Sequence, residues 1–364
     1  VDALGNKENV HTELDIVDTK PPVSQKTLGD PKHACTLDEQ TMYYPNMSDP
    51  TDGCYFINQS TPINITCADQ EPHPVNHVKI KYKDWIVGEE EPDWTTVEGN
   101  EVTITKTEDS AHILKWYCVD ELGNAENVHT EYDIVDTVPP TITITVIGPQ
   151  FYNQTEQKLY IDGATKIEVN ANDQQPHPVN HVTCDWDYTV TDGQKQGEGQ
   201  TGLTPPFNIS FPEESTHVLT IKCRDALGNE KTETRTYVVD KTPPTTTKIY
   251  GTPYVTYEGK EWINSSTTIT LSVEDTGPHK SGIKETKYRV SLVDDNYCES
   301  QQACQGATGS GNWLTYTEPF TISQESCHLI EYYSIDNVNK TEPIKKQCVY
   351  VENTPPVSEK TLGE

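Results

Sequence analysis

Aspartates recur at equivalent positions along the chain, and they are the residues best suited to do chemistry. In each repeat one precedes a Pro-Pro pair, one opens an Asp-x-x-Pro-His stretch, and one ends a strand before a Gly/Asn turn. Carboxylate oxygens are hard ligands that suit Ca²⁺ better than Zn²⁺. The predicted calcium ligands are Asp18, Asp69 and Asp120; Asp136, Asp173 and Asp225; and Asp240, Asp275 and Asp336.

Two histidine pairs form a second candidate site. The stretch Pro-His-Pro-Val-Asn-His occurs twice and places His73 with His77 and His177 with His181. Two histidines at this spacing could bind a transition metal if the loop brought them together. Packing of loop and strand-start residues at the end of a domain is the favoured explanation, since the third repeat keeps only His279.

The elements that would position these residues belong to a domain-sized repeat. A strand ending in Asp, a short turn, a second strand and Asp/Glu-x-x-Pro-Pro recur four times, with the first Asp at Asp2, Asp120, Asp225 and Asp336. Each Pro pair fixes φ and removes hydrogen-bond donors, which makes a short, semi-rigid linker. The predicted units are the last strand or strands of a preceding domain at 1–19, domains at 20–136, 137–240 and 241–352, and the first strand of a following domain at 353–364.

Alternating hydrophobicity predicts strands inside each repeat. The stretch 141–146 reads TITITV, and 166–171 and 267–273 alternate in the same way, with β-branched residues that favour half-buried strands. Turn residues separate these runs, and helical periodicity is not apparent. Several short strands in a unit of this size predict a β-sandwich.

The third repeat carries a resemblance to a known family. It reads VEDTGPHKSGIKETKYRV, NWLTYTEPFTIS, HLIEYYSIDNVNKTEP and VENTPP. These segments resemble extracellular Ig-like repeats of bacterial and archaeal surface proteins, although Val338-Asn339 lacks the usual Gly. The resemblance covers the other two repeats through their alignment with the third. It implies an all-β fold of tandem immunoglobulin-like β-sandwich domains in a linear array at a cell surface.

This fold would bring the aspartates together. In an Ig-like sandwich the chain enters at the end that also carries the B–C and F–G loops, so the linker acid and two loop acids converge. Asn124, Asn229 and Asn339 offer nearby amide oxygens. A cation there would stiffen the junction between domains. Aspartates also serve turn chemistry at strand ends, and that alternative stays open.

Cysteines and sequons point to an oxidising, extracellular setting. Sequence alone does not fix connectivity. The spacing of Cys67 and Cys118 resembles an Ig inter-sheet bridge, and Cys184 and Cys223 are alone in their repeat. The predicted disulfides are Cys35–Cys54, Cys67–Cys118, Cys184–Cys223, Cys298–Cys304 and Cys327–Cys348. Sites for N-linked glycans are predicted at Asn46, Asn58, Asn64, Asn153, Asn208, Asn264 and Asn339.

Composition narrows the classes of function. The formal net charge of −30 disfavours nucleic acid and anionic membranes, and an acidic surface also serves solubility. The sequence lacks a long apolar run that could span a membrane. It also lacks a nucleophile elbow, a zinc-protease motif and a phosphate-binding loop, so we expect no enzyme.

The leading prediction is a structural segment of a long extracellular, glycosylated, disulfide-stabilised microbial surface protein, such as a filament, sheath, S-layer or stalk. Residues 2–18 and 120–136 differ at only three of seventeen positions, which is typical of a homogeneous array. Its predicted partners are copies of itself or neighbouring repeats, including pairing by strand addition. Alternatives are an adhesin, whose tip lies elsewhere or on the Cys298–Cys304 loop, and accessory modules of a secreted enzyme.

Overall fold

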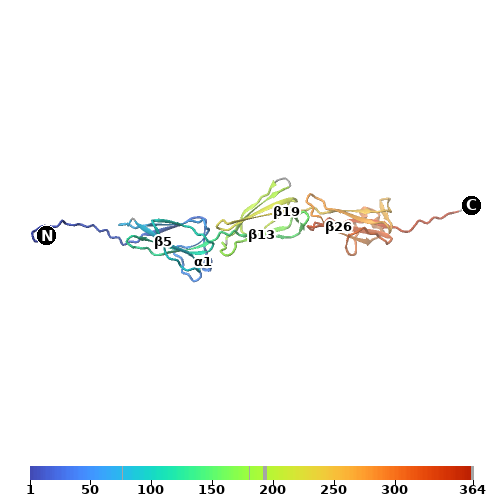
Figure 1. Cartoon of the computed structure of the whole chain (residues 1–364). Coiled ribbons are helices and arrows are strands. Elements are labelled where there is room, and N and C mark those ends of the chain that lie inside the picture. Colours follow the sequence, from blue (N-terminus) through green and yellow to red (C-terminus); the bar gives the residue numbers. More distant parts are fainter. Residues whose placement is uncertain (76, 180, 192–194, 362–364) are drawn as a thin grey trace.

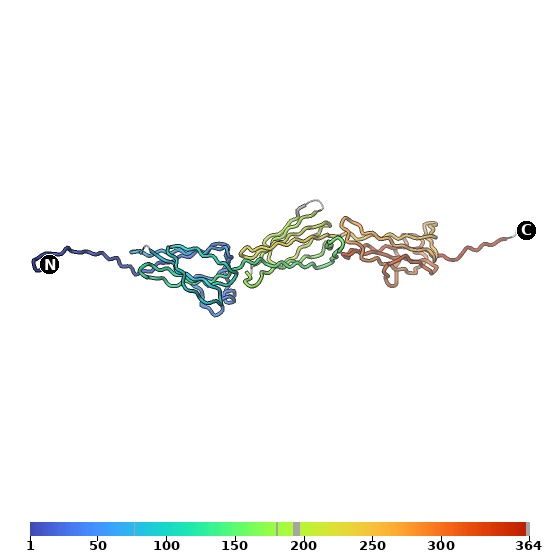
Figure 2. Tube along the Cα trace, viewed as in Figure 1, coloured from blue at the N-terminus to red at the C-terminus, as the bar shows by residue number. Residues whose placement is uncertain are grey.

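The computed structural model describes residues 1–75, 77–179, 181–191 and 195–361. Three β-sandwiches follow one another along a line (Figure 1), and extended terminal segments lead away from the first and the last (Figure 2). The fold is all-β, with tandem immunoglobulin-like β-sandwich domains, as the sequence predicted. We refer to the sandwiches as the first, second and third domains in chain order.

The first domain packs a three-stranded sheet on a six-stranded sheet. The smaller sheet has the order β1 (Val23–Leu28), β4 (Ile63–Ala68), β7 (Glu101–Ile104). The larger sheet has the order β2 (Lys32–Ala34), β3 (Cys54–Ile57), β9 (His129–Val135), β8 (Ala111–Asp120), β5 (Val78–Ile86), β6 (Thr95–Glu98). A short helix, α1 (Leu37–Tyr43), lies between β2 and β3.

The second domain repeats this plan. Its smaller sheet has the order β10 (Thr141–Ile147), β13 (Lys166–Asn172), β17 (Phe207–Ile209). Its larger sheet has the order β11 (Gln150–Asn153), β12 (Lys158–Ile161), β19 (Glu230–Val239), β18 (Thr216–Arg224), β14 (Thr183–Val190), β15 (Lys195–Gln196), and β16 (Gln200–Leu203) also pairs with β14.

The third domain has a two-stranded smaller sheet, β20 (Thr245–Tyr250) and β23 (Ile269–Glu274). Its larger sheet has the order β21 (Tyr254–Tyr257), β22 (Lys260–Ile263), β27 (Lys345–Val351), β26 (Ser326–Asp336), β24 (Ile283–Leu292), β25 (Leu314–Thr315). Two short helical segments, η1 (Asp295–Cys298) and α2 (Gln301–Gln305), follow β24.

Alternation of side chains builds the core between the sheets. Along β18 every second residue is buried, and along β10 every second residue is half-buried while the others are exposed. These inward residues form one hydrophobic cluster with members from both sheets, including Val169 and Leu219. In each domain the last strand also pairs in parallel with an early strand, through β3–β9, β12–β19 and β22–β27. The chain therefore enters each domain at one end and leaves it at the other, where the next domain begins.

Helix α1 is a feature that the alternation did not predict. Its N-cap Thr36 accepts a hydrogen bond from the backbone N–H of Glu39, and the Glu39 carboxylate accepts one from the Thr36 backbone N–H. This reciprocal pair is a capping box, and its Thr-x-x-Glu spelling is visible in the sequence. Tyr44, directly after the helix, stacks on Tyr132 of β9 with ring centroids 4.0 Å apart.

Three disulfides match the predicted pairing. Cys67–Cys118 joins β4 to β8 and therefore bridges the two sheets, whereas Cys184–Cys223 joins directly opposed residues of β14 and β18. The third bridge, Cys35–Cys54, closes the segment that contains α1.

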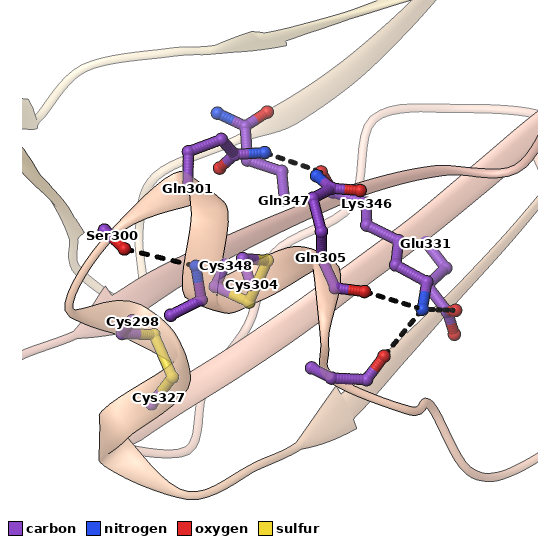
Figure 3. The surroundings of a disulfide bond; sticks show 12 residues. Cys298, Ser300, Gln301, Cys304, Gln305, Cys327, Glu331, Lys346, Gln347 and Cys348 are labelled. Atoms are coloured by element: carbon purple, nitrogen blue, oxygen red, sulfur yellow. Dashed lines mark hydrogen bonds and ion pairs between the residues drawn. A yellow bond between two sulfur atoms is a disulfide. The ribbon is translucent and has the colours of Figure 1, made fainter.

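The pairing predicted for the third domain, Cys298–Cys304 and Cys327–Cys348, is wrong. The structure joins Cys298 to Cys327 and Cys304 to Cys348 (Figure 3). Both bridges therefore attach the helical loop to the sheet rather than closing the loop and the strand pair separately.

Strand register and helical geometry explain this correction. In the β26–β27 ladder Cys327 lies opposite Tyr350 and Cys348 lies opposite Leu329, so the two strand cysteines are offset. The loop cysteines come from η1 and α2, and all four cysteines are buried in one cluster with Leu329. Cys298 of η1 therefore bonds to Cys327 of β26, and Cys304 of α2 bonds to Cys348 of β27.

Neither terminal segment forms the predicted strand. Residues 1–22 contain only a turn, and residues 352–361 have no regular element; residues 362–364 lie outside the described part. A strand requires a neighbouring strand for its hydrogen bonds, and none of the described strands pairs with either segment. The turn still forms, because Asp2 accepts hydrogen bonds from the backbone and side-chain nitrogens of Asn6.

Neighbouring domains touch through apolar side chains. Val179 and Leu227 of the second domain are buried in a cluster with Tyr44 and Phe56 of the first. Val338 of the third domain is buried with residues of the second in the same manner. Among the described residues no helix has the length and apolarity needed to cross a bilayer.

Candidate metal sites at the domain junctions

The structure brings together the predicted aspartates as three separate triads. In each triad one ligand atom per residue lies within 4.8 Å of the others. The triads are Asp18, Asp69 and Asp120 (the first junction); Asp136, Asp173 and Asp225 (the second junction); and Asp240, Asp275 and Asp336 (the third junction).

Strand ends position each triad. At the second junction Asp136 follows the last strand of the first domain, β9, while Asp173 follows β13 and Asp225 follows β18 of the second domain. One carboxylate therefore comes from the exit of one domain, and two come from loops at the entrance of the next. The distances within the triad therefore depend on how the two domains are placed relative to each other.

Asn229 holds the second junction together. Its side-chain nitrogen donates to Asp225 Oδ2 at 2.9 Å and to Asp136 Oδ2 at 3.0 Å. Asp225 Oδ1 accepts the backbone N–H groups of Leu227 and Asn229, and Asp173 Oδ2 accepts that of Val179. Each carboxylate of this triad therefore has hydrogen-bond donors of its own.

The first junction repeats this arrangement with Asn124. Its side-chain nitrogen donates to Asp120 Oδ2 at 2.8 Å and reaches Asp18 Oδ2 at 3.5 Å. Asp69 accepts the backbone N–H groups of Gln70 and Val75. In both junctions the asparagine acts as a donor between two acids, not as the oxygen ligand that the sequence predicted.

The third junction differs, because Asn339 does not take the place of Asn124 and Asn229. Asn339 lies one residue earlier in the turn, with a φ of 65°, and its Oδ1 accepts from Lys284. The equivalent position is Lys340, whose backbone N–H donates to Asp336 Oδ1 while its ammonium pairs with Asp162 of the second domain at 2.6 Å. No side-chain amide of the described residues spans this triad.

Two carboxylate oxygens at the third junction are consequently left without a donor. Asp275 Oδ1 and Asp336 Oδ2 are buried and have no hydrogen-bond partner among the described residues. Asp336 is 0% exposed and Asp275 is 7% exposed. Buried, unpaired carboxylate oxygens are costly, and their position beside Asp240 makes this triad the one best suited to accept a cation.

Burial changes the protonation of these groups. Burial, together with the charges of neighbouring aspartates, raises the pKa of Asp136 and of Asp336 to about 7. Burial also raises the pKa of Asp173, Asp240 and Asp275. The carboxylates resist ionisation together in the absence of a counter-charge, and a divalent cation would remove that repulsion.

The donor chemistry fits a hard cation. The three triads offer only carboxylate oxygens, and backbone carbonyls such as that of Asp136 lie at the same turns. Calcium takes six to eight oxygen ligands in flexible geometry, with waters completing the shell. Three carboxylates drawn from two domains can hold such an ion, and its positive charge offsets their negative charges.

The histidines do not assemble into a metal site. His177 contacts the ring of Tyr43 at 5.6 Å, and His181 contacts the ring of His33 at 4.4 Å, both across the junction between the first two domains. Within the described residues, none of the groups suited to a metal includes a histidine. Packing at the domain end accounts for His177 and His181.

None of the seven sequon asparagines is buried. Asn58 and Asn264 recur for a structural reason: each side-chain oxygen accepts the backbone N–H two residues on, at Ser60 and Ser266. This Asx turn closes the loop that follows β3 and β22. The recurrence of these two half-buried asparagines therefore follows from turn geometry.

Comparisons with known proteins add little. No family model and no curated protein matches the chain. Among solved structures, one match is a crystal structure described as the FN1–FN3 domains of chicken CNTN1, with 10% identity, a TM-score of 0.26, and coverage of 81% of this chain and 95% of that chain. We draw nothing about this chain from a likeness with so low a TM-score.

Proposed function

We propose that this chain is a structural segment of a long extracellular rod whose domain junctions are stiffened by Ca²⁺. The observation that carries the proposal is the composition of the second and third triads, in which the exit acid of one domain meets two loop acids of the next. The same set is built at the entrance of the first domain, where Asp18 of the extended segment 1–22 supplies the linker acid. A cation at each would tie neighbouring domains together without any additional contact.

The turn that carries one ligand also carries the apolar contact between domains. Asp225 Oδ1 accepts the N–H of Leu227, and the Leu227 side chain is 5% exposed in the core cluster of the first domain. Asp336 and Val338 repeat this arrangement at the third junction. A cation that fixes the aspartate therefore also fixes the apolar side chain, which resists bending of the junction.

Five disulfides and seven sequons, none with a buried asparagine, support an extracellular location. Each disulfide stabilises by about 2–4 kcal/mol through restriction of the unfolded chain, and such bonds persist in oxidising environments. All ten cysteines are paired in the structure. We place the segment in a microbial filament, sheath, S-layer or stalk, without enzymatic activity, on the basis of its resemblance to Ig-like surface repeats.

Calcium titration of the full chain tests the proposal. We expect isothermal calorimetry to detect Ca²⁺ binding and scanning calorimetry to show a higher Tm with Ca²⁺ and a lower one with chelator. A quantity of Mg²⁺ equal to the Ca²⁺ serves as control, because its smaller octahedral shell fits a flexible all-protein site poorly. Identical melting curves in calcium and chelator would refute the role of the cation.

Electron microscopy of native material tests the rod itself. Uniform filaments or sheaths that contain this chain would support the structural role. Isolated molecules with specific binding to glycans or cells would instead favour an adhesin.

A further inference from the structure

The space between the sheets of the first domain contains charged side chains. Lys26 lies on an inward position of β1, and Glu131 lies on β9, the last strand of the domain. The side chain of Lys26 is 9% exposed and that of Glu131 is 0% exposed. Lys106 and Asp133 form a second buried pair, with both side chains at 0% exposure and a separation of 3.2 Å.

Lys26 and Glu131 are held in direct contact. The Lys26 Nζ touches Glu131 Oε2, and the rings of Tyr55 and Trp116 flank the ammonium at 5.2 and 5.8 Å. Neither oxygen of Glu131 has a hydrogen-bond partner among the described residues. An ion pair with so few additional hydrogen bonds does not repay the desolvation of both charges. A bond that removes both charges would avoid this cost.

We propose that Lys26 and Glu131 become joined by an intramolecular amide bond. Transfer of one proton from the Lys26 ammonium to the Glu131 carboxylate that it touches gives a neutral amine and a neutral acid. The Nζ atom then attacks Cδ of Glu131, and the new bond is Nζ–Cδ. The Cδ–O bond to the hydroxyl breaks, and this hydroxyl leaves as water with one proton from the nitrogen. No oxidant, reductant or further reactant is required, because an acid and an amine give an amide and water.

The site supplies the conditions for this condensation. Because the amine and the carboxyl group are already in contact, the reaction is intramolecular, and each group reacts as if the other were present at a very high concentration. Burial lowers the pKa of Lys26 to about 8, so a part of the amine is neutral near neutral pH. Asp133 lies on the same face of β9, two residues further, and burial raises its pKa, which favours a neutral carboxyl group beside Glu131. Exclusion of water then favours the amide over hydrolysis.

The other two domains provide an internal contrast. Lys26 is the fourth residue after its Pro pair, and the same position holds Ile144 in the second domain and Lys248 in the third. Glu131 is matched by Arg235 and by Gln347, and the Gln347 amide donates to Glu261 at 2.6 Å. Only the first domain therefore combines a lysine with an acid at these two positions. The cross-link would connect its first strand to its last and make that domain inextensible under pulling.

Mass spectrometry of the full chain tests the proposal. The chain is produced in a host without N-glycosylation and reduced before measurement. We expect it to be lighter than its sequence by one water molecule, and a joined peptide to contain Lys26 and Glu131. A chain at the full sequence mass would overturn the inference.

Two matched variants locate the bond. Lys26→Arg keeps the charge but cannot form the amide, so it should recover the full mass, whereas Lys106→Arg should retain the loss of water. Near-ultraviolet circular dichroism checks that both variants fold, and the mass of the unaltered chain remains decisive if one does not. A loss that persists in Lys26→Arg, or a joined peptide with Lys106 and Asp133, would refute the assignment.

Discussion

The second and third junctions contain the same three aspartates but satisfy them differently. At the second junction the Asn229 amide donates to both Asp136 and Asp225. At the third junction Lys340 replaces this amide and directs its ammonium to Asp162, outside the triad. The carboxylate cluster alone therefore does not determine dependence on a cation. The residue four positions after the turn aspartate decides how many oxygens still need a partner.

The largest expected effect concerns the apolar contact rather than the charges. Leu227→Ala should weaken the second junction by about 2–5 kcal/mol, because a buried leucine side chain is lost. The control is Leu122→Ala at the equivalent turn of the first domain, where the side chain is 62% exposed, so stability should change by less than about 0.5 kcal/mol. Scanning calorimetry of the full chain compares them, and equal effects would show that the contact does not couple the domains.

Removal of calcium should loosen the third junction more than the second. A ligand at a hundredfold excess over its Kd stabilises by about 2.7 kcal/mol, and the second junction retains its asparagine when the ion leaves. Hydrogen exchange with chelator should therefore accelerate more at the amides of Val338 and Lys340 than at those of Leu227 and Asn229. Equal acceleration at the two turns would contradict the comparison.

The calcium-free chain should lose stability as the pH rises. The pKa of Asp136 and Asp336 is raised from 3.8 to about 7 in the folded chain, so the folded state binds more protons than the unfolded state between these values. This stability is fully present below pH 3.8 and is lost as the pH passes through about 7. Saturating calcium should abolish the loss, because the ion binds the ionised form. Melting curves between pH 5 and 8, as an approximate range set by these pKa values, measure it.

Neutralising one acid should have opposite effects at the two junctions. Without calcium, Asp336→Asn should stabilise the chain by about 1–3 kcal/mol, because an amide replaces a buried oxygen that has no donor. Asp225→Asn should destabilise it, because its new amide nitrogen faces the donor of Asn229. Thermal unfolding in chelator distinguishes them; a destabilised Asp336→Asn variant would show that its oxygen has a partner.

The smallest expected effect comes from exchanging the fourth turn residue. Lys340→Asn should supply the missing donor to Asp336 and reduce the calcium dependence of the third junction by about 1 kcal/mol, the worth of one hydrogen bond. The reciprocal substitution Asn229→Lys should increase the calcium dependence of the second junction. The difference in Tm between calcium and chelator is the measurement, and an unchanged difference in both variants would remove the role assigned to this position.

Strand alternation and repeat alignment were sufficient to predict the sandwich fold, because inward residues alternate along a strand. The convergence of the nine aspartates was predicted from the topology of Ig-like sandwiches, which the resemblance of the third repeat implied. The turn at Asp2 shows how local this encoding is, since it forms without any sheet around it. The role of Asn124 and Asn229 as donors was not predicted, because spacing does not tell which amide atom faces an acid.

The features that sequence reasoning missed depend on contacts between distant segments. The pairing of Cys298 and Cys304 required the register of β26 and β27, which cysteine spacing does not encode. Lys26 was not identified from the sequence, because VSQKTL has no apolar alternation, and its partner Glu131 lies on the opposite sheet. Only the packing of the two sheets brings such residues together.

The division of the second and third triads between two domains has a consequence for a proposed array of repeats. The linker aspartate ends one repeat, and the two loop aspartates belong to the next, so a whole added repeat brings both halves of a new junction with it. The turn that follows β18 or β26 carries the apolar side chain in the same copy. Lengthening by complete repeats thus preserves every junction and adds one more, without compensating substitutions elsewhere.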